Sequence, residues 1–65
     1  MEFDKTAVVN VIARRGYSVK HLAQISGVSE PTINRILHHS GKGTLATIGK
    51  LAKALKVPAS ELIKD

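Results

Sequence analysis

The chain has 65 residues, which is enough for one small domain over residues 1–65 and leaves no room for a second. It contains no cysteine, so disulfides and zinc–thiolate sites are excluded, and this composition suits a cytoplasmic location. No apolar run approaches the roughly 20 residues of a membrane helix, and the acidic start of the chain is unlike a secretory signal.

The basic residues occupy the body of the chain, and most of the acidic residues lie at its ends. The formal net charge is +5, and from Lys5 to Ser60 there are nine lysines and arginines against one acid, Glu30. A basic body is typical of proteins that bind a polyphosphate partner. A soluble surface that happens to be basic fits the same count.

Apolar residues recur at helical spacing along almost the whole chain, and no segment alternates like a strand. The first helix is predicted over residues 4–15, because Val8, Val11 and Ile12 fall on one face. Gly16 follows at the position where a residue in the left-handed conformation ends a helix.

Two short helices come next, separated by three residues. The second is predicted over residues 19–26 and ends at Gly27. The third is predicted over residues 30–38, with Pro31 in its first turn, where a missing N–H is no loss. The N-caps predicted for the first four helices share a side-chain oxygen that can accept a backbone N–H bond: Asp4, Ser18, Ser29 and Thr44.

Residues 39–43 have two glycines and no hydrophobic period, which predicts a loop. The fourth helix is predicted over residues 45–56. A short fifth helix is predicted to begin at Pro58, and its Leu62 and Ile63 either close the core or form a dimer patch. The predicted fold class is therefore all-α, a compact domain of five helices.

The junction of the second and third helices is the most informative feature of the sequence. Ala23 is small enough to let the two helices cross closely, and Gly27 can adopt positive φ, which keeps the turn to about three residues. Val28 and Ile33 fill the angle between the helices. Such a tight crossing leaves the third helix protruding, which is a shape that the major groove of DNA accepts.

Residues 18–36, SVKHLAQISGVSEPTINRI, resemble the central motif of the lambda-repressor and Cro type of helix-turn-helix regulators. The later run LAKALKV at residues 51–57, followed by Glu61 and Leu62, is similar to the fourth and fifth helices of that family. The spacing between the two runs needs no gap, so the resemblance covers nearly the whole chain. It implies a lambda-repressor-like DNA-binding domain with its helix-turn-helix at about residues 18–38.

The resemblance also implies that the third helix enters the major groove while its neighbours hold the DNA backbone. The residues implied to face base edges are exposed positions at the start of that helix and one turn later: Ser29, Glu30, Pro31, Asn34 and Arg35. The residues implied to contact phosphates lie at helix starts or around the loop: Ser18, Val19, Lys20, Thr32, His38, His39, Ser40, Lys42 and Thr44.

Several of these positions also fit a second role. Arg35 suits bidentate reading of guanine, and it equally suits a solvated surface. Asn34 reads adenine or lies outside the groove, while Pro31 touches a thymine methyl or is only a helix-start proline. His38 and His39 contact phosphate or are simply exposed. Three further lysines are expected to form a solvated helix face rather than a contact surface: Lys50, Lys53 and Lys56.

Four residues depart from the family pattern around this site. Val19 stands where the family often has glutamine, so it offers a phosphate only its backbone N–H. His39 replaces a frequent glycine after the third helix, and Gly43 replaces a frequent loop proline. Glu30 places a negative charge beside phosphates, which is unfavourable unless it accepts a hydrogen bond from a base amine such as cytosine N4.

Ile12 and Leu37 occupy the two positions at which many family members carry an arginine and a glutamate joined in a buried salt bridge. Both charges are absent together, so no unpaired buried ion remains. Replacing a buried ion pair by apolar residues is often neutral or stabilising, by about 1–4 kcal/mol. We therefore expect Ile12 and Leu37 to pack on each other.

These patterns predict a sequence-specific transcriptional regulator, and in particular a bacterial or phage repressor that binds double-stranded DNA as a homodimer on an inverted repeat. The alternative is an antitoxin-like or accessory module that uses the same fold to hold a partner protein. No carboxylate pair or hydroxyl–histidine arrangement indicates an enzyme, and the three histidines lack ligand spacing. No cofactor, metal, small-molecule ligand or membrane contact is expected.

Overall fold

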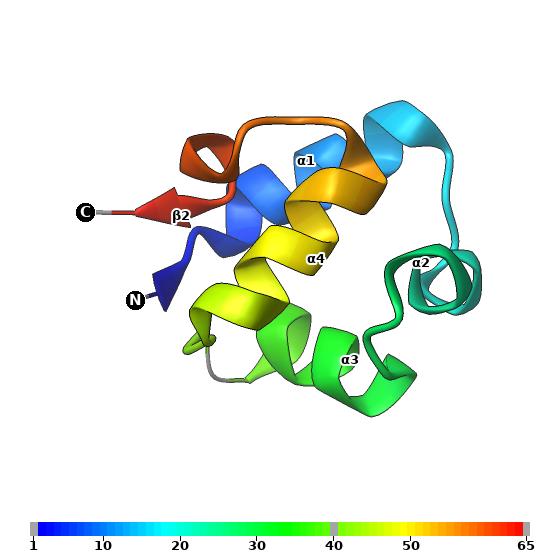
Figure 1. Ribbon diagram of the computed structural model, residues 1–65, viewed down its shortest axis with the longest axis horizontal. Helices are drawn as coiled ribbons and strands as arrows, with labels where there is room; N and C mark the ends of the chain where they lie inside the picture. Colours follow the sequence, from blue (N-terminus) through cyan, green and yellow to red (C-terminus); the bar gives the residue numbers. More distant parts are fainter. Residues whose placement is uncertain (1, 40, 65) are drawn as a thin grey trace.

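The computed structural model describes residues 2–39 and 41–64, and within them it contains four α-helices (Figure 1). In chain order the elements are β1 (Glu2–Phe3), α1 (Lys5–Arg15), α2 (Val19–Ser26), α3 (Glu30–His38), α4 (Leu45–Leu55), the 3-10 helix η1 (Ala59–Glu61) and β2 (Ile63–Lys64). Helix α4 packs against both α1 and α2, and α3 packs against α1 and α2. The helices therefore surround one shared core.

The prediction of an all-α domain of five helices is wrong in two respects. The fifth helix is a single 3-10 turn, and the prediction that the chain has no strand also fails. Strands β1 and β2 pair antiparallel, with Glu2 opposite Lys64 and Phe3 opposite Ile63. Each strand has two residues, which is too short for an alternating pattern to be visible in the sequence.

The four predicted N-caps are confirmed, and each lies in the extended conformation that a cap adopts. Each side-chain oxygen accepts a hydrogen bond from the backbone N–H three residues later, at distances from 3.0 to 3.3 Å. Gly16 and Gly27 end α1 and α2 in the left-handed conformation, as expected. Lys56 lies one residue beyond α4, where it is the left-handed cap with φ 59°.

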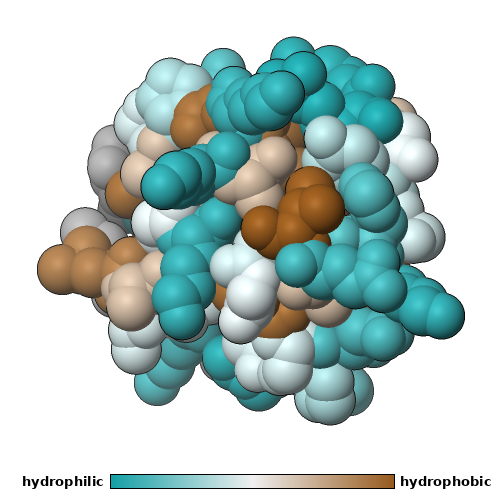
Figure 2. Space-filling model, turned by 45° about the vertical axis from the view of Figure 1, so that its right-hand side comes forward, coloured by the Kyte–Doolittle hydropathy of each residue, from teal (hydrophilic) through white to brown (hydrophobic). Residues whose placement is uncertain are grey.

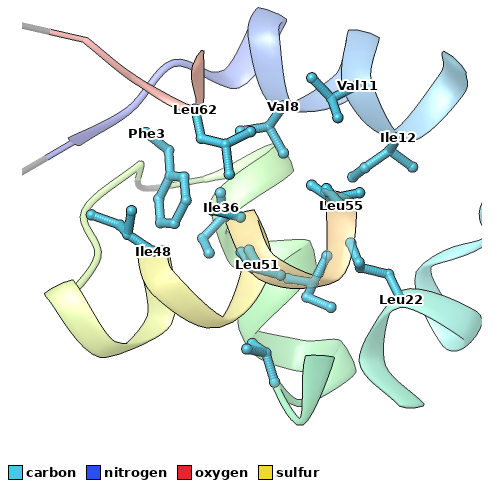
Figure 3. Packing of buried hydrophobic residues seen from close by; sticks show 13 residues of the cluster. Phe3, Val8, Val11, Ile12, Leu22, Ile36, Ile48, Leu51, Leu55 and Leu62 are labelled. Carbon is cyan, nitrogen blue, oxygen red and sulfur yellow. The ribbon is translucent and has the colours of Figure 1, made fainter. Parts of the chain in front are cut away.

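The core is built from buried side chains of every α-helix, together with Phe3 of β1 and Leu62 just before β2 (Figure 3). Leu62 is fully buried, so of its two expected roles it takes the one in the core. Phe3 is also fully buried, and sequence analysis missed it because it precedes the first helical pattern. In Figure 3 its ring points into the cluster, between Ile48 and Leu62.

The first and fourth helices are also joined by a polar contact at the end of each. The guanidinium of Arg15 donates through Nε to the carbonyl oxygen of Leu55, at 2.9 Å, and through Nη2 to that of Lys56, at 3.3 Å. The last carbonyls of an α-helix have no acceptor role inside the helix and carry partial negative charge. Arg15, the last residue of α1, therefore caps the C-terminal end of α4.

Candidate nucleic-acid interface

The turn between α2 and α3 has the geometry that the sequence predicts. Gly27 has φ 76°, and its N–H donates to the carbonyl oxygen of Ala23 at 3.0 Å. The side chain of Val28 is buried in the angle between the helices, and the backbone N–H of Val28 bonds to Ser26 Oγ at 3.1 Å. This short, hydrogen-bonded turn presents α3 along the lower edge of the molecule in Figure 1, beside α2.

Helix α3 has one buried side and one solvent-facing side. Ile33 and Ile36 are each 1% exposed and anchor the helix to the core. The five residues expected to face base edges are all exposed, and they come from the start of α3 and from one turn later: Ser29, Glu30, Pro31, Asn34 and Arg35. The structure therefore gathers them on the side of α3 that faces away from the core.

Ser29 and Thr32 form a reciprocal pair at the start of α3. Ser29 Oγ accepts from the backbone N–H of Thr32 at 3.3 Å and donates its own hydrogen to Thr32 Oγ1 at 2.8 Å. A hydroxyl has one hydrogen to donate, so that of Ser29 is used within this pair. Thr32 is half-buried, and its own hydroxyl hydrogen is not used in this pair.

The expected contacts at the start of α2 differ from one another in exposure. Ser18 and Lys20 are exposed, whereas the Val19 side chain is half-buried and packs against the core. The Val19 side chain is thus part of the packing, and its backbone N–H remains the predicted phosphate donor. Lys20 lines a shallow hollow between α2 and α3 together with Gln24 and Glu30. Gln24 is a candidate that sequence analysis missed, although its spacing of four residues from Lys20 places both on one helix face.

The loop after α3 is held from two directions. Arg35 Nη1 donates to the carbonyl oxygen of Lys42 at 3.1 Å, which draws the loop onto α3. On the other side, Lys5 Nζ donates to the carbonyl oxygen of His39, and Lys5 is a residue that sequence analysis did not single out. His38, His39, Lys42 and Thr44 are all exposed around this loop, while Ser40 lies outside the described residues.

The N-terminal strand forms the other side of the loop. The N–H of Phe3 donates to the carbonyl oxygen of Gly41 at 2.6 Å, and Glu2 forms an isolated antiparallel bridge with Lys42. The ring of Phe3 lies over Gly43, which explains why this position carries glycine instead of the proline common in the family. His39 has φ −128°, so the end of α3 does not use the left-handed conformation that favours glycine.

Two features of the described part of the chain bear on other functions. In residues 2–39 and 41–64, no three histidine, cysteine, aspartate or glutamate side chains are grouped so that they could hold a metal ion. No helix in those residues is long and apolar enough to cross a membrane.

Comparisons with known proteins agree with this geometry. Residues 9–65 match the Cro/C1-type HTH DNA-binding domain family. The chain is 34% identical over 61 residues to the HTH-type transcriptional regulator SutR of Escherichia coli (strain K12), covering 94% of this chain and 34% of that protein. It therefore spans about a third of the length of this curated relative.

Two solved structures share the fold. An HTH_3 family transcriptional regulator from Vibrio cholerae is 30% identical with a TM-score of 0.80, over 88% of this chain and 32% of that one. A hydroxyethylphosphonate dioxygenase is 26% identical with a TM-score of 0.87, over the whole of this chain but 14% of that one. The helix-turn-helix geometry and the match over residues 9–65 lead to one conclusion: the chain belongs to the Cro/C1-type HTH DNA-binding domain family.

Proposed function

We propose that this chain binds double-stranded DNA sequence-specifically, with α3 in the major groove, and regulates transcription. The observation that carries the proposal is the exposed side of α3, which is anchored from behind by Ile33 and Ile36 and flanked by the start of α2 and the loop of residues 39–43. A rigid protruding helix of this kind fits the width of the major groove. The basic body of the chain supplies the attraction to phosphates.

The residues divide into base readers and backbone contacts. Asn34 and Arg35 project from the middle of α3, where an amide reads adenine and a guanidinium reads guanine. Glu30 at the start of α3 suits a cytosine amine. Ser29 and Pro31 complete the set at the base edges. The donors proposed for phosphates are the side chains or backbone N–H groups of Ser18, Val19, Lys20, Thr32, His38, His39, Ser40, Lys42 and Thr44.

We further propose that the chain acts as a homodimeric repressor on an inverted repeat. One helix-turn-helix covers a single half-site, and two copies raise both the contact area and the specificity. Occupying a promoter excludes other proteins from it, which makes repression the simplest outcome of tight binding. With DNA as the partner, we propose the cytoplasm of a bacterial cell as the location of the chain. The dioxygenase likeness is confined to 14% of that enzyme, and we propose no catalytic activity for this chain.

An exposed apolar patch at Leu62 and Ile63 would favour the alternative, a module that holds a partner protein. Leu62 is 0% exposed and Ile63 is half-buried in β2, so these two residues do not offer such a patch. A DNA-binding role instead draws on the exposed residues of α3.

Selection from a pool of random duplexes tests the proposal. We expect enrichment of an inverted repeat whose half-site centres lie about 34 Å apart, one turn of the helix. Methylating guanine N7 within the half-sites should then block binding, because N7 lies in the major groove. A pool that stays random would overturn sequence-specific binding. Protection of a single half-site at saturation would contradict the homodimer, and binding that is insensitive to N7 methylation would contradict the groove assignment.

A further inference from the structure

A second surface lies between the second half of α4 and one side of α2, together with Tyr17, which precedes α2. It is an open groove of about 610 Å³, which is the size of sites that hold a small molecule or a few side chains. Its apolar floor is contributed by Tyr17, Ile25 and Ala54, and its rim by the side chains of Lys50, Lys53 and Lys56. None of these six residues belongs to the proposed DNA surface.

The floor of the groove is apolar and partly open to solvent. Ile25 is 45% exposed, and it lines the groove together with Tyr17 and Ala54. Tyr17 is half-buried and packs edge-on against the ring of His21, with centroids 4.8 Å apart, so its ring is held in place. Figure 2 brings the α2 side forward and shows a hydrophobic patch near the centre of that face, ringed by hydrophilic side chains.

The rim carries positive charge without a carboxylate to balance it. Lys50 and Lys53 are three residues apart and share a face of α4, and Lys56 follows at its cap. No acidic residue lines the groove, and in the part of the chain that the structure describes no salt bridge involves these lysines. Like charges this close repel one another, so an anionic group placed between them is favoured.

The groove shares no lining residue with the surface proposed for DNA. That surface uses the exposed side of α3, residues 18–20 and the loop before α4, whereas the groove is lined by other residues of α2, by Tyr17 before it and by the second half of α4. Lys53 follows Thr44 by nine residues, or about 13 Å along the axis of α4. Phosphates need donors and positive charge but gain nothing from an apolar floor. A protein segment uses both features of the groove.

We propose that this groove docks an acidic, amphipathic segment of a partner protein. An apolar side chain of the segment covers Ile25 and Tyr17, and its aspartates or glutamates pair with the lysine rim. Because the groove and the DNA surface use different residues, we expect the partner and the operator to bind at the same time. The proposal goes beyond DNA binding, and the chain can dock this segment with no DNA present.

The test starts from a displayed library of random 12-residue peptides selected on the full chain. The strongest peptide is then synthesised and titrated into labelled protein, while NMR follows the backbone amides. We expect selected peptides to combine at least two acidic residues with a large apolar residue and to shift the amides of His21, Ile25 and Lys53. Selection that yields no binder, or binders without acidic residues, would overturn the proposal.

Two charge-reversal variants separate this surface from the DNA surface. Lys53→Glu should weaken peptide binding at least fivefold and change operator binding less than threefold. Lys20→Glu changes a residue that is also exposed. It should change the dissociation constant of the peptide less than twofold and weaken operator binding at least tenfold. A third variant, Ile25→Gln, should weaken peptide binding at least fivefold. Thermal melts verify that each variant folds. If Lys53→Glu and Lys20→Glu weakened peptide binding equally, the result would contradict the groove as the docking site.

Two further outcomes assign the groove to another occupant and would also overturn the proposal. A DNA duplex that displaces the peptide and shifts the same amides would make the groove part of the nucleic-acid surface. Groove amides that shift with protein concentration alone would make a second copy of the chain its occupant. If DNA binding fails while peptide binding behaves as expected, the docking proposal stands and the proposed function falls.

Discussion

The ring of Phe3 occupies the space that a side chain at residue 43 would need. A Cβ atom built on Gly43 would lie 2.4 Å from Cε2 of that ring and 3.0 Å from Cδ2. Phe3 is fully buried, so its ring cannot move aside into solvent. The pair thus joins the N-terminal strand to the loop proposed to contact phosphates.

Gly43→Ala should destabilise the fold by about 1–3 kcal/mol, the usual cost of overpacking a filled core. Urea unfolding measures the change, and the cost should shrink in a Phe3→Leu background, where the ring edge is gone. The control is Gly49→Ala, because a Cβ at that exposed position in α4 meets no atom within 4 Å. It should stabilise by about 1 kcal/mol through helix propensity. Equal effects of the two alanines would contradict the Phe3 contact.

The helices and their caps could be predicted because their signals are local. A cap and its acceptor lie three residues apart, and apolar spacing repeats within each helix. The strands could not, since Glu2 pairs with Lys64 across the whole chain and each strand has two residues. Phe3 stands alone outside any period, so nothing in the sequence marks it as core.

The candidate site was predictable to a similar extent. The exposure of α3 follows from the spacing of its isoleucines, which turn the opposite side outward. The contact of Arg35 with the carbonyl of Lys42 was not predictable, because its acceptor is a backbone atom that every residue possesses. Sequence analysis overlooked Gln24 because the prediction relied on the positions of the family motif. It did not ask which other polar residues share a helix face with Lys20.

Arg15→Ala should lower the free energy of unfolding by about 1 kcal/mol or more, because two carbonyls at the end of α4 lose their charged donor. Arg14→Ala is the matched control. Arg14 lies one residue away and pairs with Glu61 at 3.9 Å on the exposed surface, so its loss should cost under about 0.5 kcal/mol. Urea melts of both variants give the comparison, and a larger cost for Arg14→Ala would refute the capping role.

Leu37→Glu tests the expected packing of α3 on α1. Leu37 is half-buried against the core and Ile12 is 9% exposed, so a lone carboxylate at residue 37 should cost about 1–3 kcal/mol. Adding Ile12→Arg should recover part of that loss by restoring an ion pair. Strict additivity in a double-mutant cycle would mean that the two side chains do not meet.

Arg35→Ala and Lys42→Ala separate base reading from phosphate binding. Loss of the guanidinium should cost about 1–3 kcal/mol on the selected operator and relax the preference at one base pair per half-site. Lys42→Ala retains the carbonyl that Arg35 contacts, so it should weaken all sequences alike and reduce the salt slope by about one. Titrations with operator and scrambled duplexes distinguish the two. Equal weakening of both duplexes by Arg35→Ala would contradict base reading and leave Arg35 as a phosphate contact or as a residue that only holds the loop through the Lys42 carbonyl.

The most direct test of sequence-specific DNA binding is a titration of the unmodified chain with operator and scrambled duplexes across a series of salt concentrations. We expect the operator to bind at least about 100-fold more tightly than the scrambled duplex. Each neutralised phosphate contributes about −0.9 to the slope of log K against log salt, so Lys20 and Lys42 on two half-sites predict a slope of about −3.6 or steeper. Equal affinity for the two duplexes, or a slope near zero, would contradict the account.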